Sequence, residues 1–194
     1  MRNLFLVPLL IIPFASVQAA PADLPETGQT TCSDSSGATI DCANTGQDGE
    51  YRSGAAWPNP RFTRGSGTTA DCITDNLTGL MWMRAPDSLG VGNWATALST
   101  SNDLSLCGFS DWRLPNVREL ESLIHNGVEN GVTYLRNEGF SILDANYYWT
   151  STSDPNPGFR SSRNVWVINL LTGLMHATGN TSTGYTFWPV RAGR

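Results

Sequence analysis

The alternation of apolar and polar positions along the chain predicts two short β-hairpins. The runs Cys72–Thr74 and Val165–Ile168 are strand-like, and each is followed within a few residues by Thr-Gly-Leu-Met. A polar turn in which glycine supplies a positive φ typically joins two hairpin strands. We therefore expect hairpins over Ile73–Trp82 and Val165–His176. Shared turn chemistry explains the common tetrapeptide more simply than an internal duplication does.

A periodicity of 3.6 residues predicts two helices between these hairpins. The clearer helix spans Asn116–Asn126, where Asn116 can cap the first turn and Glu119 completes a capping-box pattern. Its apolar face is formed by Val117, Leu120, Leu123 and Ile124. A weaker pattern predicts an earlier helix over about Asn93–Thr100.

The last third of the chain reads as a strand, a loop and a final strand. Tyr147–Thr150 is strand-like, Ser151–Asn164 is a long polar loop, and Thr186–Val190 is a second strand-like run. Strands toward both ends of the chain with helices between them predict an α+β fold with high loop content.

The first residues have the pattern of a secretory signal peptide. Arg2 supplies a positive charge, an apolar stretch runs from Leu4 to Phe14, and small residues at Val17 and Ala19 place cleavage after Ala19. The apolar stretch is shorter than the about 20 residues that a membrane-spanning helix needs. We therefore favour a cleaved signal over a retained anchor, and expect an exported protein without a stable membrane span, in the periplasm, secreted or at the cell surface.

After the predicted signal peptide of residues 1–19, the composition divides the rest of the chain into two parts. Residues 20–60 are rich in Thr, Ser, Gly and Pro and poor in aliphatic side chains, so we expect an extended leader there. The packed domain spans 61–194 in a chain that is 40% hydrophobic and contains 7 tryptophans. The formal net charge is −5, and every basic residue is arginine, without basic runs. This balance argues against nucleic acid as a partner.

Four cysteines in an exported chain predict two disulfides. Three pairings are possible. We favour Cys32–Cys42, which would close a small loop in the leader, together with Cys72–Cys107, which would tie the start of the domain to a later segment. The cysteine spacing does not match a zinc site, because no Cys-x-x-Cys pair occurs. A redox-active pair is the alternative.

No arrangement of residues predicts a catalytic site, a metal site or a cofactor. His125 follows the apolar face of the predicted helix and His176 lies in the second hairpin, but neither has a partner at a recognisable spacing. The scattered acidic residues leave a glycosidase-like carboxylate pair open without favouring it.

The polar loop carries the residues best suited to a ligand. Arg160 and Arg163 suit sulfate, carboxylate or phosphate, because a guanidinium group donates two parallel hydrogen bonds. Asn164 adjoins them, and exposed aromatic rings such as Tyr185 or Trp188 would stack on sugars. The alternative is an ordinary solvated loop with the aromatic side chains in the core.

The run Asp-Trp-Arg-Leu-Pro at 111–115 is more specific. Pro115 biases the preceding residue toward an extended conformation, just before the helix cap. Trp112 can then be buried while Arg113 is free to pair with an acid. We favour a structural ion pair for Arg113 over contact with a ligand.

Three motifs resemble, in order, those of the DUF1566 family, also called the Lcl C-terminal domain family. They are Asp-Asn-Leu-Thr-Gly-Leu-Met-Trp at 75–82, Asp-Trp-Arg-Leu-Pro-Asn at 111–116 followed by Glu-Leu, and Tyr-Trp-Thr-Ser-Thr at 148–152. The resemblance covers about Arg61–Arg194. Within and beside these motifs, we expect a structural role for six residues: Trp82, Trp112, Arg113, Pro115, Glu119 and Trp149.

The resemblance implies an exported bacterial domain of C-type-lectin-like architecture, distantly similar to formylglycine-generating-enzyme-like domains. In the collagen-like adhesin after which the family is named, the corresponding domain binds sulfated polysaccharides. The resemblance thus implies a non-catalytic recognition or adhesion module for a glycan or an anionic polysaccharide. Two alternatives are a diverged formylglycine-generating-type or other enzyme, and a structural, homo-oligomeric subunit of a surface assembly.

Overall fold

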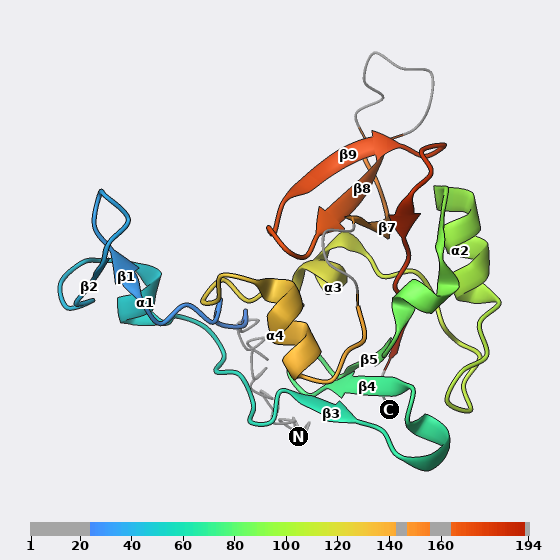
Figure 1. Ribbon diagram of the computed structural model, residues 1–194, viewed down its shortest axis with the longest axis horizontal. Coiled ribbons are helices and arrows are strands. Elements are labelled where there is room, and N and C mark those ends of the chain that lie inside the picture. Colours follow the sequence, from blue (N-terminus) through green and yellow to red (C-terminus); the bar gives the residue numbers. More distant parts are fainter. Residues whose placement is uncertain (1–23, 143–146, 156–163, 193–194) are drawn as a thin grey trace, which may run out of the picture.

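The computed structural model describes residues 24–142, 147–155 and 164–192 (Figure 1). The predicted signal peptide, Arg160 and Arg163 lie outside these residues. The described chain forms sheets of two, four and five strands, together with four short α-helices. The fold is therefore α+β, as the sequence predicts.

The four-stranded sheet is entirely antiparallel and contains the first predicted hairpin. Ile73 pairs with Trp82 at the centre of that hairpin. The strands lie in the order β11-β5-β4-β3. Their bounds are β3 Phe62–Arg64, β4 Cys72–Asp75, β5 Leu80–Met83 and β11 Val190–Ala192.

The five-stranded sheet contains the second predicted hairpin, β8 with β9. Its strand order is β6-β10-β7-β8-β9, and only the pairing of β10 with β7 is parallel. The segment predicted as a loop after Thr150 begins as strand, because β7 continues to Ser153. The bounds are β6 Val91–Gly92, β7 Tyr147–Ser153, β8 Asn164–Asn169, β9 Met175–Gly179 and β10 Tyr185–Thr186.

The prediction of one final strand over Thr186–Val190 is wrong. Thr186 ends β10 in the five-stranded sheet, whereas Val190 begins β11 in the four-stranded sheet. Phe187 and Trp188 are buried in two different clusters of core side chains, and Pro189 has no N–H to donate to a sheet ladder. The chain therefore crosses from one sheet to the other at this point.

Two of the helices correspond to those predicted. In α2, the Asn93 side chain accepts a hydrogen bond from the Thr96 amide at 2.9 Å. The helix α3 has the expected capping box but ends at Glu121, because the amides of Leu123 and Ile124 bond to carbonyls only three residues back. The bounds are α1 Asp48–Tyr51, α2 Trp94–Asn102, α3 Val117–Glu121 and α4 Gly131–Asn137, with 3₁₀ turns η1 Gly67–Thr69 and η2 Pro86–Leu89.

Both favoured disulfide pairings are confirmed. Cys72 and Cys107 join β4 to a later loop with 6.5 Å between their Cα atoms. The Cα atoms of Cys32 and Cys42 lie 5.1 Å apart, and this disulfide joins the first strand of a small separate sheet to the residues just after its second strand. Its strands are β1 Cys32–Ser33 and β2 Thr39–Ile40.

The segment predicted as an extended leader has a structure of its own. We call residues 24–57 the N-terminal unit and the described residues from 61 onward the main domain. Figure 1 shows β1, β2 and α1 of the N-terminal unit standing apart from the two larger sheets. Close to the main domain, Glu26 and Ala55 pair through their main chains, and Asn126 of the main domain donates to Thr27.

Candidate functional site

Arg113 forms the structural ion pair that the sequence predicts. Its guanidinium group donates two hydrogen bonds to the Glu119 carboxylate, at 2.7 and 2.6 Å. The same carboxylate accepts the Asn116 amide at 2.8 Å, and the Arg113 main chain pairs with Val190 of β11. This arrangement anchors α3 to the four-stranded sheet. The guanidinium group of Arg113 thus has a structural role as the partner of Glu119.

The prediction that Trp188 presents its ring to a ligand is wrong. Trp188 has no exposed surface, and its Nε1 donates to the carbonyl of Met83 at 2.7 Å. Its ring packs against Trp82 at 5.7 Å and Phe140 at 5.1 Å between centroids. Four tryptophan side chains are buried: Trp82, Trp112, Trp149 and Trp188.

Asn164, predicted beside the loop arginines, opens β8 and pairs with Gly179 of β9. Its side chain is half-buried, and its carbonyl accepts the Asp154 amide at 2.9 Å. Because Arg160 and Arg163 lie outside the described residues, their contact with a ligand stays a prediction.

A continuous row of aromatic rings crosses the five-stranded sheet on one face. His176 of β9 contacts Tyr147 of β7 at 4.7 Å between ring centroids, and Tyr147 contacts Tyr185 of β10 at 5.8 Å. Tyr185 in turn contacts Trp149 at 5.0 Å. We call these four residues the aromatic row.

Strand register explains why the row forms. Side chains alternate between the two faces of a strand, so Tyr147 and Trp149 share a face. His176 pairs with Val167, which itself pairs with Trp149, and this places His176 on the same face. The parallel pairing of β10 with β7 adds Tyr185 beside them.

The aromatic row runs from the core to the surface. Trp149 is fully buried in the cluster that includes Ala97 of α2, whereas Tyr147 and Tyr185 are half-buried and His176 is exposed. Rings presented from a rigid sheet can stack on an apolar ligand face without a large loss of conformational entropy. Sequence reasoning named Tyr185 but missed Tyr147 and His176 as its neighbours, because only the register brings them together.

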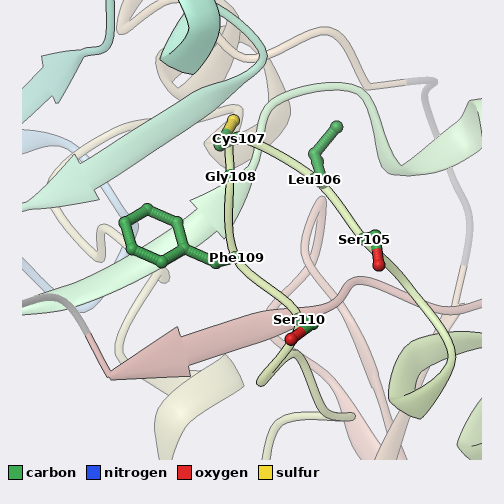
Figure 2. A pocket seen from close by; sticks show the side chains of 6 residues that line it. All are labelled: Ser105, Leu106, Cys107, Gly108, Phe109 and Ser110. Atoms are coloured by element: carbon green, nitrogen blue, oxygen red, sulfur yellow. The ribbon is translucent and has the colours of Figure 1, made fainter.

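A shallow hollow lies beside the second disulfide and is lined by the six residues 105–110 (Figure 2). Leu106 and Phe109 pair through both of their main-chain groups, and Cys107 and Gly108 form the turn with positive φ. The side chains labelled in Figure 2 include two serines and no acidic, basic or histidine group. The hollow is therefore a consequence of the turn and offers little chemistry.

The described part of the chain contains no group of three or more His, Cys, Asp or Glu side chains arranged to hold a metal ion. All four cysteines are in disulfides. An oxidase mechanism of the formylglycine-generating type would therefore find no free thiol in this structure. Among the helices of the described residues, none has the length and apolar character to cross a bilayer.

The fold and the row together define a disulfide-bonded α+β domain in which a row of aromatic side chains on one sheet runs from the core to the surface. The profile of the Lcl C-terminal domain matches residues 71–191. The chain belongs to the Lcl C-terminal domain family. The matched range contains all three motifs and the whole aromatic row. No curated protein matches the sequence.

Proposed function

We propose that this protein is an exported, non-catalytic recognition module that binds a glycan through the aromatic row. The observation that carries the proposal is the continuous contact from His176 through Tyr147 to Tyr185 on one sheet face. A pyranose ring has an apolar face of C–H groups, and aromatic rings at a protein surface stack on such faces.

Charge favours a neutral glycan over a strongly anionic one at this row. The chain carries 17 acidic residues against 12 basic ones. A polyanion would approach against this net negative charge unless a local group of arginines compensates for it. Arg160 and Arg163 are the sequence-predicted candidates for that role, so salt dependence separates the two kinds of ligand.

The test is a binding screen of the mature protein on neutral and sulfated glycans at two salt concentrations. We expect Tyr185→Ala and His176→Ala to weaken binding of a neutral glycan by about tenfold each, because each substitution removes one aromatic contact with the ligand. Tyr51→Ala is the matched control, because Tyr51 is an exposed tyrosine on α1 outside the family match.

The control must bind as the wild type does, and thermal melts must show that each variant is folded. Binding that is unaffected by Tyr185→Ala and His176→Ala would remove the row from the proposal. No binding above background across both glycan classes would contradict the glycan function itself.

A further inference from the structure

His125 lies at the junction between the N-terminal unit and the main domain. Its ring contacts Trp57 and Tyr134, with centroids 4.7 Å apart in both pairs. Gly28 approaches so closely that a Cβ there would lie 2.6 Å from Cε1 and Nδ1 of His125. Trp57 is held in place by its Nε1, which donates to the carbonyl of Glu26 at 2.7 Å. Both parts of the chain therefore contact the imidazole of His125, which is half-buried.

Hydrogen bonds next to His125 require its neutral form. The Gly127 amide donates to Nδ1 of His125 at 3.0 Å, and a ring nitrogen accepts only when it carries no proton. The adjacent Asn126 amide donates across the junction to the carbonyl of Thr27 at 3.0 Å. The turn that contacts the N-terminal unit is thus the turn that His125 stabilises.

Positive charge already lies at this junction. The Arg61 guanidinium carbon lies 4.0 Å from the centroid of the Trp57 ring. Arg61 is buried and pairs with the buried Asp75 at 3.4 Å, while its Nη2 also donates to the carbonyl of Ser122. Its Nη1 is buried without a hydrogen-bond partner among the described residues. A second positive charge beside this group would be poorly compensated.

Among the charges around the junction, that of Arg61 is the one that lowers the pKa of His125. Tyr134 stays neutral, because burial raises the pKa of its hydroxyl. The charge of Glu138, at the end of α4, also raises the pKa of the Tyr134 hydroxyl. From the N-terminal unit, Glu26 contributes its main-chain carbonyl, and the Asp48 carboxylate accepts a hydrogen bond from the Thr27 hydroxyl.

We propose that this junction is a pH-sensitive clasp, in which protonation of His125 releases residues 24–57 from the main domain. The added proton places a cation near Arg61 and converts Nδ1 from an acceptor into a donor, so the Gly127 amide loses its partner. Release changes how the main domain is held relative to the preceding chain, and each part retains its own disulfide.

The direction of the response follows from linkage. Desolvation lowers the pKa of His125, and the charge of Arg61 lowers it further. The closed clasp thus binds protons less readily than the released state does. It has its full strength above the ordinary value of 6.5 and weakens as the pH falls below it, until the closed state also becomes protonated.

The experiment is hydrogen–deuterium exchange of the mature protein at pH 7.5 and pH 5.0, corrected for the intrinsic pH dependence of exchange. We expect protection of the peptide that contains the amides of Asn126 and Gly127 to fall by about threefold or more at pH 5.0. The pairing of β5 with β11 must stay protected at both values, because neither strand contains a residue of the junction.

The chain has 2 histidines, which supplies a matched pair of variants. His125→Gln must remove the pH response, whereas His176→Gln must keep it. A wild-type protein with equal protection at both pH values, or a His125→Gln variant with the wild-type response, overturns the proposal.

A second measurement is independent of how His125→Gln folds. Trp57→Ala removes the main aromatic contact from the N-terminal unit, so an NMR titration must show the pKa of His125 rising toward that of a free histidine. An unchanged pKa in Trp57→Ala also overturns the clasp.

Discussion

Asp75 and Asn169 occupy the same position in two turns that share one hydrogen-bond pattern, although the turns belong to different sheets. In each turn the main-chain carbonyl accepts the amide of a glycine four residues later, Gly79 or Gly173, at 2.8 Å. Each side chain also accepts the amide two residues later, at 3.0 and 2.9 Å. The glycines have φ of 70° and 71°. This common geometry accounts for the repeated Thr-Gly-Leu-Met. Asp75 differs from Asn169 in having a carboxylate, which forms an ion pair with Arg61.

The positive φ of Gly79 makes the first turn a test of backbone strain. We expect Gly79→Ala to lower the free energy of unfolding by about 1–2 kcal/mol, because an L-residue is strained in this conformation. Steric crowding does not contribute, since an added Cβ at Gly79 would meet no atom within 4 Å. Urea denaturation measures the change. Gly79→Asn is the control and should cost less, because asparagine tolerates the left-handed region.

The Arg113–Glu119 pair predicts a specific dependence of stability on pH. Burial alone would raise the pKa of Glu119, but the hydrogen bonds from Arg113 and the Asn116 amide outweigh it, so the pKa lies below 4.5. A lowered pKa in the folded state means that the contribution is complete above the unfolded value and is lost as the pH falls through the folded one.

Glu119→Gln should therefore be less stable than the wild type by about 1 kcal/mol at pH 7, a value limited by the partial exposure of the pair. The difference should shrink as the pH falls through the lowered pKa of Glu119, because the wild-type carboxylate then takes up a proton. Denaturation curves at pH 7, 4 and 3 measure it. A difference that is constant over this range would show that the charge of Glu119 is unimportant.

The two disulfides should stabilise different parts of the molecule. The ring closed by Cys72 and Cys107 spans 35 residues of sequence, and its removal by double substitution with alanine should cost the main domain about 4 kcal/mol. The ring of Cys32 and Cys42 spans 10 and lies within the N-terminal unit, so its loss should cost about 3 kcal/mol there. Calorimetry checks this, and equal effects of both removals on the main transition would contradict it.

Trp188 is predicted to serve stability and not binding. Trp188→Phe leaves the carbonyl of Met83 without its indole donor and opens space in the core, at a cost of about 2–4 kcal/mol. Trp166→Phe is a suitable control, because Trp166 is only half-buried, and it should cost less. A variant of Trp188 that stays folded should bind glycan as the wild type does, so selective loss of binding would return Trp188 to the site.

Several features were predictable because their causes are local in the sequence. Turn residues and alternation predicted the hairpins β4–β5 and β8–β9, and a cap with an apolar stripe predicted α2 and the start of α3. The helix α4 was missed, although Asn130 caps it by accepting the Thr133 amide at 2.8 Å. Its pattern of seven residues is too short to stand out from the surrounding polar sequence.

The sequence by itself determined the α+β class and the family motifs, since each depends on residue types at short or characteristic spacings. It favoured one of three cysteine pairings, which the structure confirmed. Only the tertiary structure decided that the segment from Thr186 to Val190 divides between two sheets, that Trp188 is buried and that His125 meets Trp57. Only the tertiary structure decided the aromatic row as well. Its members come from β7, β9 and β10, and strand register and packing between distant segments decide which side chains meet and which reach solvent.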